Sequence, residues 1–181
     1  MIFFNKIKNC QKCSHLKDFK PIFSPVKNSK VLIIGQSPGK KENELGLPFV
    51  GPAGKKLFSW FSEIGLKEET IRKNFYITQV VKCYLGSNRM PTAKELKNCL
   101  PYLYKEINIL KPKIIIPIGS LAIKALLPEK RITEIIGKVF NQKDYLIIPL
   151  PHPSGANVWL NKKENQKKLK KALKELKKIL L

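Results

Sequence analysis

Acidic residues are scarce in this sequence of 181 residues: 13 Asp and Glu stand against 35 Lys and Arg, a formal net charge of +22 at pH 7. An imbalance of this size indicates a polyanionic partner. Arginine is also rare, so nearly all of the positive charge is lysine, which binds phosphate as a point charge. The composition favours attraction to a nucleic-acid backbone over sequence-specific readout, although a lysine-rich composition is also typical of some thermophiles.

Long hydrophobic runs are missing as well. The longest, such as VLIIG and IIIPIG, are far shorter than the ~20 residues that span a bilayer. The N-terminus has no long apolar stretch that ends in a small-residue cleavage site, which indicates a cytoplasmic protein without disulfides. The hydrophobic content of 43% excludes a disordered chain. The length suits a single domain over residues 1–181.

Four apolar runs have the pattern of buried parallel strands: residues 30–35, 74–81, 113–119 and 144–150. Helical patterns cover residues 53–64, 92–110 and 120–127, and Thr92 and Glu95 have the spacing of a capping box. The end of the chain, KKLKKALKELKKILL, predicts a basic amphipathic helix whose apolar stripe lies on the sheet, which we favour over a membrane-surface helix. The sequence therefore predicts an α/β fold, a three-layer α/β/α sandwich around a four-stranded parallel sheet, with ligands bound beyond the carboxyl ends of the strands.

The four cysteines form two pairs, and none is left over. Cys10 and Cys13 form a C-x-x-C motif, whereas Cys83 and Cys99 follow the second predicted strand. Four thiols with one tight pair indicate a metal centre in a reducing compartment. Zinc and an iron-sulfur cluster both accept four thiolates, and the spacing does not separate them from each other. Four independently buried cysteines are a third alternative.

Nucleotide-phosphate motifs are absent from the glycine-rich segment after the first predicted strand. GQSPGKKENELGLPFVGPAGKK contains neither a P-loop nor a G-x-G-x-x-G fingerprint. Its glycines would let the backbone approach a sugar, a base or a phosphate closely. After the last predicted strand, PLPHPSGANVW holds His152 between two prolines, beside Ser154 and Gly155. This place at the carboxyl end of a strand favours a functional His152.

Five segments together resemble the iron-sulfur (family 4, thermostable-type) uracil-DNA glycosylases of archaea and bacteria. They are GQSPG, GLPFVGPAGKKL, ITQVVKC, NRMPTAKELKNCLPYL and PHPSG, in the same order and at similar intervals. The resemblance implies the uracil-DNA glycosylase-like fold and a DNA repair enzyme that flips uracil out of DNA and hydrolyses its N-glycosidic bond. It also implies a [4Fe-4S] cluster on Cys10, Cys13, Cys83 and Cys99.

The expected partner is DNA, single- or double-stranded, in the nucleoid of a prokaryotic cell. Nothing in the sequence suggests an obligate oligomer, so we expect a monomer. A sliding clamp is a further candidate partner, which the sequence neither indicates nor excludes.

The resemblance also implies roles for single residues. Phe49 matches the aromatic residue that stacks on the flipped base, and His152 matches the histidine that donates a hydrogen bond to uracil O2, where negative charge grows. Ser154 and Gly155 match the loop that grips the DNA backbone. The segment 35–39 would form the floor of the base site, with Gly35, Ser37 and Gly39 as substrate-binding residues.

Two residues depart from the family pattern. Gln36 stands where glutamate is usual, and glutamine cannot serve as a general base. Glu42 is then the best remaining carboxylate for orienting water or steadying the sugar, so Gln36 and Glu42 join His152 as candidate catalytic residues. Gln79 stands where asparagine reads the edge of uracil, and it reaches one methylene further.

Two other functions stay open. One is a glycosylase for another deaminated base, such as hypoxanthine. The other is a non-catalytic iron-sulfur module that binds nucleic acid. The combination of Phe49, His152 and Glu42 favours an enzyme, because binding to the DNA backbone alone would not require it.

Overall fold

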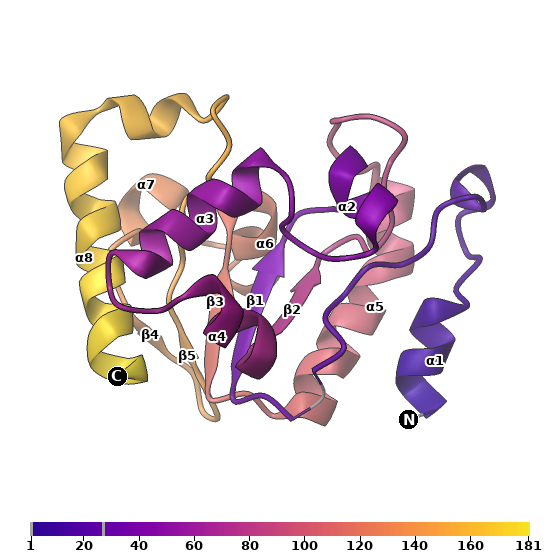
Figure 1. Ribbon diagram of the computed structural model, residues 1–181, viewed down its shortest axis with the longest axis horizontal. Helices are drawn as coiled ribbons and strands as arrows, with labels where there is room; N and C mark the ends of the chain where they lie inside the picture. Colours follow the sequence, from indigo (N-terminus) through magenta and orange to yellow (C-terminus); the bar gives the residue numbers. More distant parts are fainter. Residues whose placement is uncertain (1, 27) are drawn as a thin grey trace.

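A five-stranded sheet forms the centre of the molecule in the computed structural model, which describes residues 2–26 and 28–181 (Figure 1). The strands are β1 (Val31–Gly35), β2 (Tyr76–Gln79), β3 (Ile114–Pro117), β4 (Phe140–Asn141) and β5 (Leu146–Ile147), in the spatial order β2-β1-β3-β5-β4. β2, β1, β3 and β5 are parallel, whereas β4 pairs with β5 in the antiparallel direction. The predicted four-stranded parallel sheet is confirmed, and β4 adds an edge strand too short to leave a periodic pattern.

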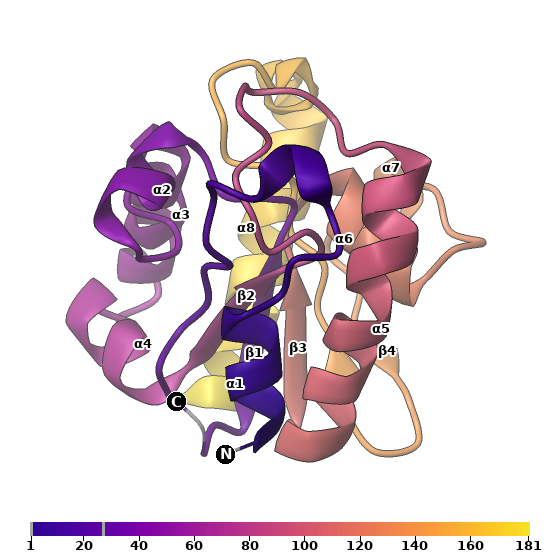
Figure 2. The same cartoon turned by 90° about the vertical axis from the view of Figure 1, so that its right-hand side faces the viewer.

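Helices cover both faces of this sheet (Figure 2). α3 (Pro52–Ser62), α4 (Glu68–Asn74) and α8 (Lys163–Leu180) pack on one face, and α1 (Ile2–Lys8), α5 (Ala93–Leu110) and α6 (Gly119–Leu126) pack on the other. The short helices α2 (Lys40–Leu45) and α7 (Ile132–Ile135) lie in connections. The three-layer α/β/α sandwich expected from the sequence is therefore confirmed.

The alternation of side chains along β1 explains the two apolar layers. Val31 and Ile33 belong to the core beneath α3, α4 and α8, whereas Leu32 and Ile34 belong to the core beneath α1, α5 and α6. All four side chains are buried. Since both faces of a parallel sheet are covered, each strand reads as a continuous apolar run.

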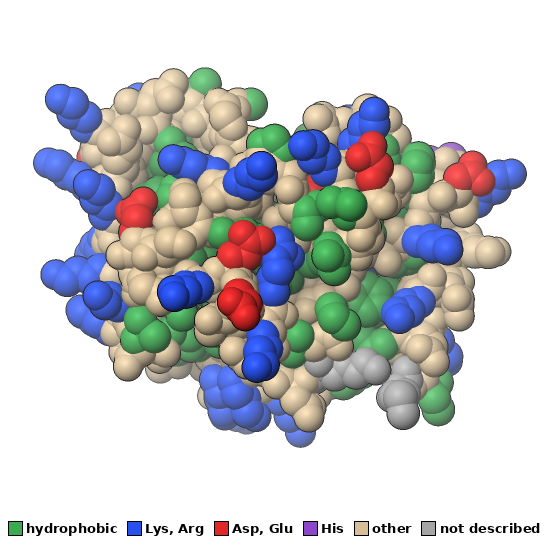
Figure 3. All heavy atoms as spheres, in the orientation of Figure 1, with side chains coloured by type: hydrophobic (Ala, Val, Ile, Leu, Met, Phe, Trp, Pro, Cys, Tyr) green, Lys and Arg blue, Asp and Glu red, His purple; other side chains and the backbone are tan. Residues whose placement is uncertain are grey.

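The C-terminal helix α8 is amphipathic, as predicted. Leu169, Ala172, Leu173 and Leu176 are buried in the core that α8 shares with α3 and the sheet. The lysines of α8 face outward, and Figure 3 shows basic side chains gathered along the edge where this helix lies. Among the described residues, no helix is long and apolar enough to cross a membrane.

Loops from four parallel strands gather at one edge of the sheet, the upper edge in Figure 1. They follow β1 (residues 36–51, which include α2), β2 (80–92), β3 (residue 118) and β5 (148–162). The loop after β2 ends in the predicted capping box, in which the Thr92 hydroxyl accepts from the Glu95 N–H and the Glu95 carboxylate accepts from the Thr92 N–H. These connecting segments carry every candidate site residue except Cys10, Cys13 and Cys99, and except Gly35 and Gln79, which are the last residues of β1 and β2.

Candidate active site

An aromatic ring and a buried amide lie against Gly35 at the end of β1. Gly35 and Gln79 are register partners in the adjacent strands β1 and β2. A Cβ atom added to Gly35 would lie 2.9 Å from Phe49 Cζ and 3.4 Å from Gln79 Cγ. Any side chain at position 35 would therefore push against the Phe49 ring. The structure brings together these three residues, which the sequence assigned to substrate binding.

The side chain of Gln79 is buried but incompletely hydrogen-bonded. Gln79 is 2% exposed, and its Oε1 atom has no hydrogen-bond partner among the described residues. Leaving a buried acceptor unpaired costs about 1–3 kcal/mol. An acceptor of this kind, in a side chain that lies with an aromatic ring against Gly35, is suited to a planar ligand that brings an N–H donor.

His152 is held in one orientation by its own loop. The Ser154 N–H donates to His152 Nδ1 at 3.2 Å, and Ser154 Oγ lies 2.9 Å from the same nitrogen. Burial lowers the pKa of His152, which keeps the imidazole neutral. Because Nδ1 accepts a backbone hydrogen bond, the single ring proton of the neutral form is assigned to Nε2. His152 therefore presents an N–H donor at its far end.

Hydrogen bonds stabilise the base of the turn that carries His152, whereas the tip of the turn is exposed to solvent. Asn157 Nδ2 donates to the His152 carbonyl at 2.7 Å, and the Asn157 N–H donates to the Ser154 carbonyl at 3.0 Å. Gly155 and Ala156, at the tip, are exposed. Exposed backbone at the tip, next to the half-buried Ser154, is suited to contact with a large ligand such as a DNA strand.

Glu42 lies in α2 and binds backbone rather than another side chain. Its carboxylate accepts hydrogen bonds from the N–H groups of Gly39 (3.1 Å), Val50 (2.9 Å) and Gly51 (2.7 Å). These contacts close the loop between β1 and α3. Gln36, the other departure from the family pattern, is half-buried, and its carbonyl accepts from the Val81 N–H at 2.9 Å.

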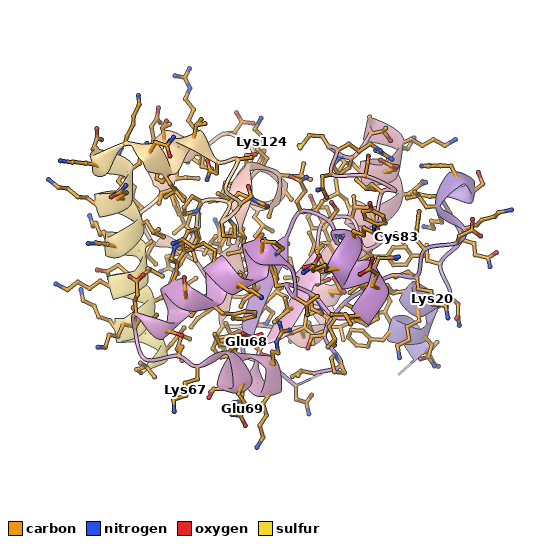
Figure 4. All side chains as sticks on the ribbon, turned by 45° about the horizontal axis from the view of Figure 1, so that its top comes forward. Lys20, Lys67, Glu68, Glu69, Cys83 and Lys124 are labelled. Carbon is orange, nitrogen blue, oxygen red and sulfur yellow. The ribbon has the colours of Figure 1, made fainter. Side chains whose placement is uncertain are left out.

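The four cysteines come from distant parts of the chain but influence one another electrostatically. Burial, together with the negative charges of Cys99, Cys10 and Cys13, raises the pKa of the Cys83 thiol to about 12. Cys13, Cys83 and Cys99 also belong to one apolar cluster near the start of α5, and Figure 4 labels Cys83. Among the described residues, no three Cys, His, Asp or Glu side chains converge closely enough to hold an ion as they stand.

The donor set nevertheless fits a thiolate-bound metal centre. The Lys82 N–H donates to Cys99 Sγ, and Asn98 Nδ2 donates to Cys13 Sγ, both at 3.4 Å. N–H donors of this kind stabilise sulfur that carries negative charge.

Sequence reasoning missed an ion-pair network that joins the two cysteine pairs. The Glu95 side chain is fully buried, and it binds Arg89 Nη2 at 2.6 Å and His15 Nε2 at 2.8 Å. Hydrogen bonds from Arg89 hold the pKa of Glu95 far below its usual range. The segment after Cys13 is thereby tied to the helix that carries Cys99.

A second network lies beneath Gln79. Lys82 and Glu106 are 1% and 0% exposed, and Lys82 Nζ lies 2.7 Å from Glu106 Oε2 and 2.6 Å from the Gln79 carbonyl. The Tyr76 hydroxyl donates to Glu106 Oε1 at 2.6 Å. The sequence carried a signal for this pair: Lys82 directly follows a predicted apolar strand, and Glu106 occupies a position on the apolar face of a predicted helix.

The fold and the placement of these residues define a class first: three-layer α/β/α proteins whose ligand site lies at the carboxyl edge of a parallel sheet. Within that class, the chain belongs to the uracil-DNA glycosylase superfamily. The family model described as "Uracil DNA glycosylase superfamily" matches residues 21–177.

Individual relatives agree with this family. A type-4 uracil-DNA glycosylase of Pyrobaculum aerophilum is 43% identical over 124 residues, which cover 67% of this chain and 61% of that protein. A type-4 uracil-DNA glycosylase of Saccharolobus solfataricus is 36% identical over 185 residues, which cover 93% of this chain and 84% of that protein. A type-5 uracil-DNA glycosylase of Pyrobaculum aerophilum is 28% identical over 188 residues, which cover 86% of this chain and 83% of that protein. The resemblance to the family 4 enzymes is confirmed.

Proposed function

We propose that this chain is a DNA-repair glycosylase that flips uracil out of DNA and hydrolyses its N-glycosidic bond, leaving an abasic site. The observation that carries the proposal is the buried Oε1 of Gln79, which has no hydrogen-bond partner among the described residues and belongs to a side chain that lies with the Phe49 ring against Gly35. Uracil is planar, and its N3–H and O4 offer the donor and acceptor that a glutamine amide pairs with. Membership of the uracil-DNA glycosylase superfamily supports the same substrate.

In this proposal His152 stabilises the leaving group. As the glycosidic bond breaks, negative charge grows on uracil O2, and the Nε2–H of the neutral imidazole donates to it. The hydrogen bond from the Ser154 N–H to Nδ1 keeps the ring proton on Nε2 before the reaction begins. A donor fixed in advance stabilises the transition state without reorganisation.

The remaining candidate residues complete the site. Phe49 stacks on the base, while Gly35, Ser37 and Gly39 form the floor. Gln36 is the candidate group that hydrogen-bonds the attacking water without taking its proton. Glu42, whose carboxylate is occupied by three N–H groups, is the candidate negative charge that steadies the oxocarbenium-like sugar. Ser154 and Gly155 contact the DNA backbone.

We also propose that Cys10, Cys13, Cys83 and Cys99 hold a [4Fe-4S] cluster. When bound, the cluster would supply a structural link between the N-terminal segment and the start of α5. The purified protein is then expected to be brown, with the broad visible absorption of an iron-sulfur cluster. A colourless protein that contains zinc would contradict this assignment.

The proposed partner is DNA, which the net charge of +22 attracts. We further propose that residues 1–181 act as one domain and as a monomer in the nucleoid. A sliding clamp remains a candidate partner.

Excision is tested on single- and double-stranded oligonucleotides that carry one uracil, with thymine in the matched controls. Alkali cleaves the DNA where a base has been released, so cleavage of the uracil strands alone is the expected result. Tight binding without cleavage would overturn the proposed enzymatic activity and favour a non-catalytic module that binds nucleic acid.

A hypoxanthine-containing strand belongs in the same experiment, because the extra methylene of Gln79 shifts its amide relative to asparagine. Release of hypoxanthine without release of uracil would overturn only the assignment of uracil as the substrate.

A further inference from the structure

Phe49 has an unusual backbone conformation. Its φ is +54°, and among the described residues only Lys111 is another non-glycine residue with a positive φ. The left-handed region is unfavourable for a residue with a Cβ atom, so the surrounding structure must hold Phe49 there.

The side chain of Arg72, in α4, binds the two carbonyl groups on either side of the Phe49 Cα. Arg72 Nη1 donates to the Pro48 carbonyl and Nη2 donates to the Phe49 carbonyl, both at 2.9 Å. Only the planar fork of a guanidinium presents two donors in this geometry. The two hydrogen bonds fix the orientation of the peptide units that flank the Phe49 ring.

Arg72 is itself held in place. Its Nε donates to Glu68 Oε1 at 2.8 Å, and its guanidinium carbon lies 4.7 Å from the centre of the Phe58 ring. Figure 4 labels Glu68 on α4. The Arg72 side chain is only 25% exposed, so protein contacts, rather than solvent, determine the orientation of its guanidinium group.

The opposite side of the Phe49 backbone is closed by α3. A Cβ atom added to Gly54 would lie 2.0 Å from the Phe49 carbonyl oxygen, so no other residue fits at position 54 without moving Phe49. The carbonyl is thus held between Arg72 and Gly54, while the ring lies against Gly35.

We propose that Arg72 is a positioning residue, which holds Phe49 in the left-handed conformation that directs its ring toward Gly35 and Gln79. This inference rests on the proposed function, in which Phe49 stacks on the flipped base. A ring oriented before binding does not have to be ordered when the base arrives, which strengthens stacking.

The test compares Arg72→Gln with Arg131→Gln, because both remove one positive charge and Arg131 is exposed. Base-aromatic stacking accounts for enough binding energy that we expect Arg72→Gln to lower kcat/KM for uracil excision about 10-fold, with Arg131→Gln close to wild type. Arg72→Lys, which keeps the charge but not the fork, should behave like Arg72→Gln. Full activity of Arg72→Gln would overturn the inference.

A double substitution separates positioning from general stability. If Arg72 acts through Phe49, then Arg72→Gln has no further effect on excision in the Phe49→Ala background. The same fold-loss in both backgrounds would overturn the inference.

A readout without any substrate distinguishes failure of this inference from failure of the proposed function. In protein labelled with fluorophenylalanine, the Phe49 resonance is assigned by its loss in Phe49→Leu. We expect Arg72→Gln to shift and broaden that ¹⁹F resonance, whereas Arg131→Gln leaves it unchanged. An unchanged resonance in Arg72→Gln overturns the role of Arg72, whether or not the wild-type protein releases uracil.

Discussion

At the scale of single residues, His152 combines burial with one fixed ring nitrogen. Its pKa is lowered by burial, and Nδ1 is occupied by the Ser154 N–H. Protonation of the ring would therefore cost burial energy and break that hydrogen bond. Both consequences can be measured.

The first prediction concerns excision. His152→Ala removes the proposed donor to uracil O2, and we expect the rate to fall by about 10²-fold or more, which is the usual effect of losing one transition-state donor. The measurement is single-turnover release of uracil. A wild-type rate would remove His152 from the proposed site.

The second prediction concerns stability and pH. Because the pKa of His152 is lower in the folded chain, the unfolded chain binds the proton more readily. The contribution of His152 to the free energy of unfolding is thus complete above pH ~6.5 and declines as the pH falls toward the folded pKa. Denaturant titrations should show a weaker pH dependence in this range for His152→Gln. An unchanged dependence would contradict a neutral, half-buried imidazole.

At the scale of secondary structure elements, the junction of β3 and α6 supports the His152 ring. Gly119, the first residue of α6, has a φ of +82°, and an added Cβ atom would lie 3.0 Å from His152 Cδ2. Gly65 has a similar φ of +90°, but the nearest atom, Leu181 Cδ1, would be 3.6 Å away.

These two glycines form a matched pair for the third prediction. Gly119→Ala and Gly65→Ala both impose a left-handed conformation on alanine, so both should lower stability. Only Gly119→Ala should also displace His152 and lower the excision rate at temperatures where both variants are folded. Equal rates for the two variants would show that crowding at Gly119 does not reach the histidine.

The buried pair between the end of β2 and α5 gives the fourth prediction. Glu106→Gln leaves the Lys82 ammonium buried without its counter-charge, which typically costs about 3–5 kcal/mol. The double variant Lys82→Met/Glu106→Leu, which removes both charges, should be more stable than either single variant. Chemical denaturation measures all of these, and strict additivity would contradict a coupled pair.

The elements with long apolar patterns were those that the sequence predicted. β1, β2, β3, β5, α3, α5, α6 and α8 follow from runs of buried residues or from a capping box. α1, α2, α4 and α7 span at most seven residues each, which is too short for a reliable helical period.

The sequence predicted the residues that lie together in the candidate site, but not the residues whose side chains position them. Gly35, Phe49 and Gln79 were assigned through their motifs, and the structure brings them together. The role of Arg72 and the contact of Glu95 with His15 were missed, because the two residues of each contact lie 23 or 24 and 80 residues apart in the chain. No local pattern encodes a pairing of that separation.

At the scale of the whole molecule, the charge and the site have separate tasks. Lysines are spread over the surface, including the outer face of α8, whereas the residues assigned to base recognition are buried or half-buried. In the proposed function, attraction to the backbone therefore holds the protein on any DNA, and the site at the carboxyl edge of the sheet selects the base.

This division gives the fifth prediction. Affinity for DNA without uracil should fall linearly with salt on logarithmic axes, with a steep slope that reports the number of phosphates contacted. Fluorescence anisotropy at several salt concentrations provides the slope. Phe49→Ala should leave it unchanged, because the ring carries no charge. A flat salt response would contradict the assigned role of the lysines.

The contact of His15 and Arg89 with Glu95 has a consequence for biosynthesis. The segment that follows Cys10 and Cys13 finds its binding partner in α5, 80 residues later in the chain. During translation the first two cysteines are made long before Cys99, so the N-terminal segment lacks this contact while the next 80 residues of the chain are made. We therefore expect the N-terminal cysteines to be the most exposed to oxidation and to premature metal capture in the nascent chain, until α5 has folded and provided their place.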